Sequence, residues 1–319
     1  MSTLLLNRQD VETLLHEDAA LESLRRGFVA YSCGERTARR VSVALPGPGS
    51  AMVILPGLSE GIPAYSVKVH AKYPARSPAI RGRLLLHDLE SGAVLCIMES
   101  GYLTAVRTGL AAALATHELA RDDARVVAVV GAGTQGRFQL RYLARMRPLQ
   151  RVHVYDTDSG AARRYCDEMA AELALDAVPH GDAESALAEA QIVLVATWAR
   201  EPLFAADHVR PGTHVTSLGA DQPGKRELPA ALLREATLVC DDRALTLEMG
   251  AAGNAGLGPD VIDAELGEVL ANSHPGRRHP HERTVFVSVG LAFQDLAVAW
   301  QVYRAALATD RGQRFDFGR

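Results

Sequence analysis

The chain has 319 residues, 48% of them hydrophobic and 23% charged, which favours two folded domains and excludes an intrinsically disordered chain. Its formal charge of -4, from 34 basic and 38 acidic residues, gives no electrostatic case for binding nucleic acid or an anionic membrane. The four cysteines are far apart and form no CxxC pair, so we expect reduced thiols and no zinc site.

The first third of the chain combines a helical segment with several short strands. Helical periodicity covers residues 9–31, and an alternation of period two begins near residue 39. The strands are expected at residues 41–45, 52–55, 65–70, 83–87 and 93–98. The last two flank Asp88–Gly92, whose acidic residues and glycine suit a hairpin turn, so we predict an antiparallel meander. A long helix follows over residues 102–119.

A different pattern begins at Arg125. The continuous apolar run Val126–Val130 is typical of a strand buried on both faces of a parallel sheet, and an amphipathic helix is expected over 138–146. Further strands and helices are expected at 152–155, 161–173, 192–196, 214–217, 237–240, 285–289 and 292–307. This alternation predicts an α/β fold with a doubly wound, Rossmann-type parallel sheet.

A glycine-rich loop, Gly131–Gly136, joins the strand Val126–Val130 to its helix and reads Gly-Ala-Gly-Thr-Gln-Gly. In this context Gly131 permits a tight turn, Gly133 lets the backbone approach a pyrophosphate, and Gly136 allows close helix packing. The unpaired amides at the helix N-terminus would face the anion. The pattern predicts a dinucleotide site, and the alternative is a glycine turn that binds no nucleotide.

Asp156 follows the next strand, twenty residues beyond Gly136. A carboxylate at that strand end accepts hydrogen bonds from a ribose 2′-hydroxyl and repels a 2′-phosphate. Thr157 stands where an arginine would favour the phosphorylated cofactor. We therefore predict NAD rather than NADP, the alternative being a solvated turn aspartate.

The chain shows no pattern of a membrane span, a targeting signal or a metal site. The apolar run at residues 1–6 stops at Asn7, and no stretch approaches the ~20 apolar residues of a span. His274, His279 and His281 gather in a polar loop, where solvent exposure is favoured over metal binding. We expect a soluble, cytoplasmic protein.

Seven segments, in this order, match a known pattern: Ala38–Val41, Val67–Val69 with Tyr73–Pro74, Leu103–Thr108, Gly131–Gln135, Pro211–His214, Leu218–Leu228 and Ser288–Ala297. On these segments the chain resembles the ornithine cyclodeaminase/mu-crystallin family. That family includes ornithine cyclodeaminase, an archaeal-type alanine dehydrogenase and ketimine reductases. The resemblance implies a substrate-binding and dimerisation domain at 1–118 with 297–319, a Rossmann domain at 119–296, and a homodimer.

The resemblance also implies roles for single residues. Arg40 would bind the substrate carboxylate, with Arg39 leaving the register open by one residue, and Lys68 and Arg107 would also contact substrate. Lys68 and Asp221 would be the catalytic residues. For NAD, the resemblance implies contacts from Thr108, Gly131, Gly133, Thr134, Gln135, Gly136, Asp156, Thr197 and Ser288.

These residue types suit an amino-acid or imine substrate. An arginine fork binds a carboxylate bidentately, a lysine adds a titratable donor, and Asp221 can accept a proton or orient water or ammonia. Taken singly, each has an ordinary structural role instead: Lys68 at a sheet edge, Arg107 on a helix surface, Asp221 in a turn, Arg40 in a solvated strand.

Three functions follow from the resemblance: an NAD-dependent amino-acid or imine oxidoreductase, a cyclodeaminase that reuses its NAD, and a binding protein without catalysis. The chain departs from the family at Trp198 and Val287, both expected near the cofactor. It also reads Val53-Ile-Leu-Pro56 where ornithine cyclodeaminase has Glu-Leu-Met-Pro. Because valine cannot accept a hydrogen bond from the distal ammonium, we expect a shorter or apolar substrate and poor activity on ornithine.

Overall fold

The structure is a computed structural model that describes residues 2–34, 40–74, 76 and 78–318. The chain forms two compact units. Unit 1 is Met1–Arg107 with Leu291–Arg319, and unit 2 is Thr108–Gly290. The division predicted from the sequence, at 118/119 and 296/297, lies later in the chain, inside the helices α3 (Gly101–Leu119) and α11 (Ala292–Thr309).

Unit 1 contains a seven-stranded sheet in the order β15-β1-β6-β5-β4-β3-β2. The strands of the sheet are β1 (Thr3–Leu6), β2 (Val41–Ala44), β3 (Ala51–Gly57), β4 (Ala64–Lys72), β5 (Ile80–Asp88), β6 (Val94–Glu99) and β15 (Gln313–Phe315), and the helices α1 (Arg8–Leu14) and α2 (Glu17–Cys33) belong to the same unit. The antiparallel meander predicted from the sequence is observed in β2 to β6. The sequence did not predict β1, which pairs parallel with β6, or β15, which pairs antiparallel with β1.

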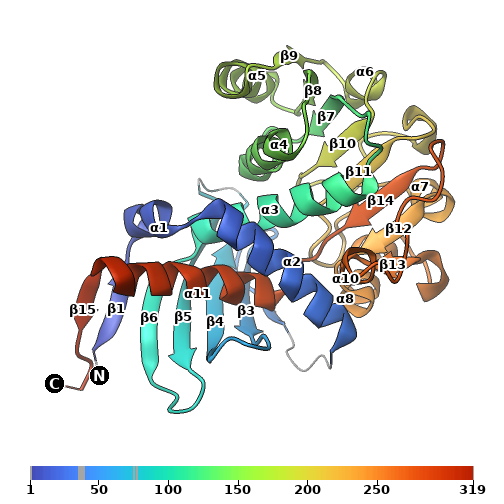
Figure 1. The fold of residues 1–319 in the computed structure, drawn as a ribbon. Helices are drawn as coiled ribbons and strands as arrows, with labels where there is room; N and C mark the ends of the chain where they lie inside the picture. Colours follow the sequence, from blue (N-terminus) through green and yellow to red (C-terminus); the bar gives the residue numbers. More distant parts are fainter. Residues whose placement is uncertain (1, 35–39, 75, 77, 319) are drawn as a thin grey trace. The chain divides into compact units, whose positions relative to one another are not determined.

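Two helices cover one face of this sheet: α11 packs on β3, β4 and β5, and α2 packs on α11 (Figure 1). The periodicity over residues 9–31 forms α1 and α2 rather than one helix. A capping box starts α1, because the Asn7 side chain accepts from the Asp10 N–H and Asp10 accepts from the Asn7 N–H. Between the helices, Leu15 has an extended backbone that ends α1.

Unit 2 contains an eight-stranded sheet in the order β13-β12-β14-β11-β10-β7-β8-β9, in which every pair of neighbours is parallel. Its strands are β7 (Val126–Val130), β8 (Arg151–Tyr155), β9 (Asp176–Pro179), β10 (Ile192–Val195), β11 (His214–Ser217), β12 (Thr237–Cys240), β13 (Ala264–Glu265) and β14 (Thr284–Val287). Its helices are α4 (Thr134–Met146), α5 (Ser159–Leu173), α6 (Ala183–Leu187), α7 (Ala230–Glu235), α8 (Arg243–Glu248), α9 (Ala251–Asn254), α10 (Leu266–Leu270) and the short η1 (Ala206–His208) and η2 (Pro259–Val261).

The doubly wound α/β fold is therefore confirmed. Helices α4 and α5 lie together beside β7 and β8 (Figure 1), while α6 joins the apolar cluster on the other face of these strands. The switch in strand order falls between β7 and β10, because the chain runs from β7 outward to β9 and then returns to β10. In such sheets ligands bind at the carboxyl ends of the strands beside this switch. Among the described residues, no helix is both long and apolar enough to span a membrane.

Candidate functional site

The glycine loop of unit 2 is built as its spacing predicts. Gly131 has a φ of +104°, and a Cβ added there would lie 2.5 Å from the Ala196 carbonyl oxygen. A Cβ at Gly136 would collide with the Gly131 carbonyl oxygen. At Gly133 an added Cβ would meet no atom within 4 Å, so the backbone there borders open space. These features fit a loop that a pyrophosphate approaches at Gly133.

Two further groups of the loop fit a dinucleotide. Gly133 is the N-cap of α4, and no side chain caps the helix, which leaves its first amides available to an anion. Thr134 is exposed at the start of α4. The Gln135 Oε1 atom is buried and has no hydrogen-bond partner within the part of the chain that the structure describes.

Asp156 stands at the end of β8 beside this loop. Its Oδ2 accepts from the Ala132 N–H at 2.8 Å, and its Oδ1 accepts from the Asp158 N–H at 2.9 Å. Both contacts hold the carboxylate in one orientation. The glycine loop and the carboxylate expected to contact ribose are thus joined by a direct hydrogen bond.

The two hydroxyl residues predicted to contact NAD follow other strands of unit 2. Thr197 follows β10, and its N–H and Oγ1 both donate to Glu227, the latter at 2.8 Å. Ser288 follows β14, and its Oγ donates to Asp241 Oδ2 at 2.7 Å. Burial raises the pKa of Asp241 to about 6, although Ser288 and the backbone of the following loop lower it. Both hydroxyls are therefore oriented by buried carboxylates that sequence reasoning did not single out.

Asp221 lies in the turn that follows β11, as predicted. Its Oδ1 accepts from Lys225 Nζ at 2.9 Å, and 22% of its side chain is exposed. The backbone of the turn is closed by the Asp221 N–H, which donates to the Gly219 carbonyl oxygen at 2.9 Å. Thr108 is a half-buried residue of α3, at the first position of unit 2.

In unit 1, Lys68 and Arg107 meet at one buried carboxylate, Asp295. Lys68 Nζ lies 2.7 Å from both oxygens of Asp295, and Arg107 Nε lies 3.2 Å from Oδ1. Arg107 also donates to Gln294 Oε1 at 2.6 Å, and Lys68 to Thr104 Oγ1 at 3.3 Å. The side chains of Lys68, Arg107 and Asp295 are only 1%, 8% and 2% exposed. The roles of sheet-edge lysine and helix-surface arginine are therefore wrong for this chain.

The position of each member follows from local structure. Lys68 is an inward residue of β4, in register with Leu55 on β3 and Leu84 on β5. Arg107 is in α3, and Asp295 is in the first turn of α11, where the helix dipole favours an acidic residue. Asp295 lies in the family segment Ser288–Ala297, but the sequence alone assigned it no role.

The electrostatics of this cluster favour a titratable lysine. Burial lowers the pKa of Lys68 to about 7; Asp295 opposes that shift, while the charges of Arg107 and Arg40 add to it. Burial alone would raise the pKa of Asp295, but Arg107 and Lys68 outweigh it and the pKa is lowered. Arg40 lies just before β2, and its charge contributes to the lowered pKa of Lys68. Arg39 is outside the described residues.

His70 was also missed, although it is the next inward residue of β4 after Lys68. Burial, together with the charges of Lys68, Lys72 and Arg40, lowers the pKa of His70 to about 3, so the imidazole is neutral. In register with His70 on β3 is Val53, which is 1% exposed and lies on the same face of the sheet as Lys68. Val53 is thus a buried apolar residue on the face that carries Lys68, and its place in the wall of a substrate site stays a prediction.

Of the two departures from the family pattern, Val287 is 2% exposed and belongs to the apolar core of unit 2. A valine can be buried among the strands there, where a lysine would need a partner, and its expected position near the cofactor stays a prediction. Trp198 is 43% exposed, and the Lys225 Nζ lies 4.0 Å from the centroid of its ring.

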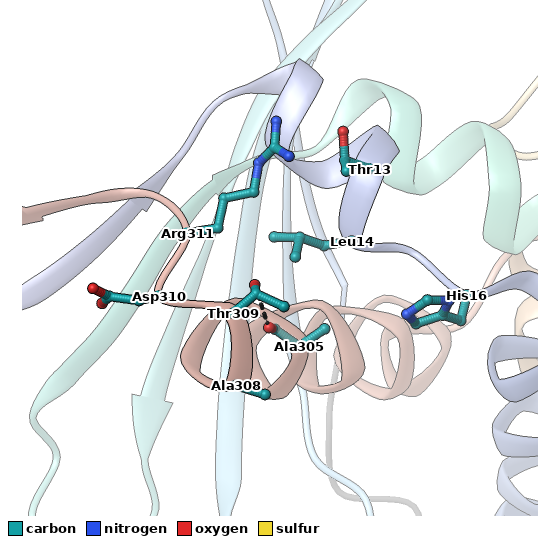
Figure 2. A pocket seen from close by; sticks show the side chains of 8 residues that line it. All are labelled: Thr13, Leu14, His16, Ala305, Ala308, Thr309, Asp310 and Arg311. Atoms are coloured by element: carbon teal, nitrogen blue, oxygen red, sulfur yellow. Dashed lines mark hydrogen bonds between the residues drawn. The ribbon is translucent and has the colours of Figure 1, made fainter.

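A surface pocket in unit 1 lies apart from these residues. It is formed where the corner between α1 and α2 meets the end of α11 (Figure 2). Two of its polar side chains are engaged: Arg311 donates to Asp10 at 2.8 Å, and Thr309 donates to the Ala305 carbonyl oxygen at 2.8 Å. The predicted site residues, all of them described, do not line it.

Two curated relatives match almost the whole chain. Alanine dehydrogenase of Archaeoglobus fulgidus is 32% identical, over 100% of this chain and 100% of its own. A delta(1)-pyrroline-2-carboxylate reductase of Bacillus cereus is 29% identical, over 89% of this chain and 90% of its own.

Three solved structures of related enzymes resemble this chain over almost its whole length. The delta(1)-pyrroline-2-carboxylate reductase of Thermococcus litoralis, in complex with NADH and L-proline, has a TM-score of 0.92 at 32% identity, covering 98% of this chain and 99% of that one. An archaeal alanine dehydrogenase dimer with bound NAD has a TM-score of 0.92 at 31% identity, covering 99% and 100%. A lysine cyclodeaminase that recognises L-lysine, L-ornithine and L-2,4-diaminobutyric acid has a TM-score of 0.91 at 28% identity, covering 99% and 96%.

The family model described as "Ornithine cyclodeaminase/mu-crystallin family" matches residues 1–310. The resemblance found in the sequence segments is therefore confirmed, and the chain belongs to the ornithine cyclodeaminase/mu-crystallin family of NAD enzymes.

Proposed function

We propose that this protein is an NAD-dependent oxidoreductase of an amino acid or its imine, of the alanine dehydrogenase or ketimine reductase type. The observation that carries the proposal is the buried cluster of Lys68, Arg107 and Asp295. Because two cations share one carboxylate there, the cluster keeps positive charge for an anionic ligand. A substrate carboxylate would supply the negative charge that balances it.

NAD is the proposed cofactor, and the residues present fit it. The loop Gly131–Gly136 would hold the pyrophosphate at the open backbone of Gly133, and the oriented Asp156 carboxylate would accept from the ribose. The further contacts proposed are Thr108, Thr134, Gln135, Thr197 and Ser288. When bound, NAD supplies hydride transfer at its nicotinamide. Solved relatives with NADH or NAD support the choice.

The chain's own residues would bind, orient and protonate the substrate. Arg40 and Arg107 are proposed to bind its carboxylate, since an arginine fork matches carboxylate geometry. Lys68 adds a second cation, and its pKa of about 7 lets Nζ hold or release a proton near neutral pH. Asp221, partly exposed in its turn, would accept a proton or orient a water or ammonia molecule.

A cyclodeaminase is the second candidate, favoured by the likeness to a lysine cyclodeaminase. In such an enzyme the substrate's own side-chain amine attacks an imine, ammonia leaves, and the cofactor is regenerated within one turnover. The buried Val53 argues against ornithine as the substrate, because a valine side chain offers no acceptor to a distal ammonium. An unpaired charge of that kind costs about 3 kcal/mol or more, over a hundredfold in specificity. A non-catalytic binding protein is less favoured, because Lys68, Arg107 and Asp221 are all retained.

The test is a panel of amino acids, keto acids with ammonia, and cyclic imines, in which NADH and ammonia are both measured. We expect net NADH formation from an apolar or short amino acid, or NADH consumption by its imine. Ammonia release without net NADH would instead identify a cyclodeaminase. Turnover of no compound in the panel would contradict both enzymatic proposals.

Ornithine is a separate arm of the same assay. With L-ornithine and NAD, we expect proline and ammonia to form at least about a hundredfold more slowly than product forms from the best apolar substrate. Efficient proline formation would overturn the inference from Val53 and favour the cyclodeaminase.

We also propose a homodimer, formed through the sheet of unit 1. The face opposite α2 and α11 carries partly exposed apolar residues, among them Val41 (50% exposed), Val43 (47%) and Val69 (37%), and a patch of this kind marks an interface. A relative solved as a dimer supports the proposal. Sedimentation analysis should give twice the 34.2 kDa mass of the chain, and Val69→Lys should shift it toward the monomer.

A cytoplasmic location is proposed on the cysteines. All four are free thiols, three of them buried, which suits a reducing compartment. Fractionation of cells that produce the protein tests this proposal, and recovery outside the cytoplasm would contradict it.

A further inference from the structure

Trp198, Lys225 and Asp221 form a contiguous set in unit 2. Lys225 Nζ lies 2.9 Å from Asp221 Oδ1 and 4.0 Å from the centroid of the Trp198 ring. The lysine side chain is 5% exposed, whereas the indole is 43% exposed and the carboxylate 22%. A buried ammonium therefore lies between an aromatic face and a carboxylate, both of which border solvent.

The backbone fixes this arrangement from both sides. The segment after β10 is joined to the Asp221 turn, because the Arg226 N–H donates to the Ala199 carbonyl oxygen at 3.1 Å and Thr197 donates to Glu227. Asn254 of α9 donates to the carbonyl oxygens of Gln222 and Lys225 at 3.0 and 2.9 Å. Trp198 and Lys225 thus meet because their two segments are hydrogen-bonded to each other.

Three other charged groups around the turn, Glu201, Arg226 and Glu227, are engaged elsewhere. Arg226 pairs with Glu201, and both oxygens of Glu227 accept hydrogen bonds, from Thr197, Ser217 and the Gly219 N–H. Arg200 lies close to Gly224, at the far end of the turn. Lys225 is a cation in direct contact with the Asp221 carboxylate.

We propose that Lys225 is a positioning residue, which orients Asp221 and keeps it ionised, and that Trp198 holds Lys225 in place through its ring. A cation in contact favours the charged form of a carboxylate, and Asp221 must be a carboxylate to accept a proton. An ammonium over an indole face is held by the ring quadrupole, most strongly when the contact is desolvated. The proposal rests on the proposed function for the role of Asp221.

The first test is the pH dependence of kcat and KM, in the chain with NAD and its best substrate. Lys225→Met should lower kcat about tenfold or more at neutral pH and move the acid limb of the profile upward by about one pH unit, with KM little changed. Lys225→Arg should restore the position of the limb. Trp198→Leu should move it in the same direction by less, and Trp198→Phe less still.

The second test needs no substrate. The chain has two tryptophans, so Trp300→Phe leaves Trp198 as the single emitter. Because indole emission responds to nearby charge, this variant should show a pH titration that Asp221→Asn abolishes and Lys225→Met moves to higher pH. The difference between the parent chain and Trp198→Phe provides the same signal if Trp300→Phe fails to fold.

The outcomes separate this inference from the proposed function. An emission titration that depends on Asp221 and Lys225 supports the inference even if no amino acid or imine is turned over. Emission that is unaffected by Asp221→Asn, or an acid limb unmoved by Lys225→Met, overturns it. Full activity of Asp221→Asn would overturn the catalytic role of Asp221 alone.

Discussion

In unit 2 the glycine loop and the acidic residue of the candidate cofactor site come from one β–α–β stretch, in which the loop Gly131–Gly136 is hydrogen-bonded to Asp156. In unit 1 the ion cluster joins Lys68 and Arg107 to Asp295, at sequence separations of 227 and 188 residues. The first site consists mainly of backbone shape, and the second of buried charges. The glycine loop should tolerate side-chain changes that leave its turns intact. The ion cluster should be destabilised by the loss of any one of its charged partners.

The largest expected effect is therefore in unit 1, for Asp295→Asn. The change leaves Lys68 and Arg107 without their shared carboxylate, and we expect a loss of about 3 kcal/mol in the free energy of unfolding and at least about a hundredfold in turnover. Urea unfolding and steady-state rates measure these. The matched control is Asp176→Asn, which breaks the exposed pair with Arg151 and should cost under about 1 kcal/mol. Equal losses of unfolding free energy and of turnover in the two variants would contradict the contrast between buried and exposed ion pairs.

A second test uses pH to follow the buried lysine. The pKa of Lys68 is about 7 in the folded chain against an ordinary 10.5, so between these values the unfolded chain binds more protons. Stability attributable to Lys68 therefore rises with pH across this window, and is lowest below it, where the buried ammonium is charged. The urea midpoint of the parent chain, minus that of Lys68→Met, should rise from pH 7 to pH 10. A difference that stays constant would refute the lowered pKa.

The cofactor site gives a smaller effect with Asp156→Ala. NAD should bind about tenfold more weakly, because a ribose acceptor is lost, while NADP should bind no worse, so the preference narrows. Calorimetric titration with both nucleotides measures it. Asp158→Ala is the control, since that exposed side chain caps α5 and should leave the preference unchanged. Equal affinity of the parent chain for NAD and NADP would contradict the specificity argument.

The smallest expected effect on stability is at Gly133. Its φ is -85° and a methyl group there meets open space, so Gly133→Ala should change the free energy of unfolding by less than about 1 kcal/mol. NAD binding should nevertheless weaken. Gly131→Ala must adopt a positive φ within 2.5 Å of a carbonyl oxygen, and should destabilise the fold by about 2 kcal/mol or more. Thermal unfolding measures both variants. A large loss of stability in Gly133→Ala would contradict the open space beside Gly133.

The sequence predicted the parts of the molecule whose patterns are local. The run Val126–Val130, the glycine loop and the meander each follow from side-chain spacing over a few residues. The pairing of β15 with β1 does not, because it brings together the two ends of the chain in strands of three and four residues. The break between α1 and α2 was also missed, since their apolar residues keep a helical spacing across it.

The candidate site divides in the same way. Gly131, Gly133 and Asp156 could be placed from spacing, whereas Asp295 could be found only through the contacts of a final helix with a central strand. Nothing local distinguishes Asp295 from an ordinary acidic residue in the first turn of a helix. Its burial with two cations is a property of the tertiary structure, as is the neutral imidazole of His70.

The bond from the Ala132 N–H to Asp156 has a consequence for how cofactor preference could change. An enzyme engineer seeking NADP use would replace Asp156 with a small or basic residue. That replacement also removes an acceptor from the glycine loop and leaves the Ala132 N–H without it. Relaxed preference would then come with a less ordered loop, so a useful switch needs a second substitution that supplies a new acceptor for Ala132.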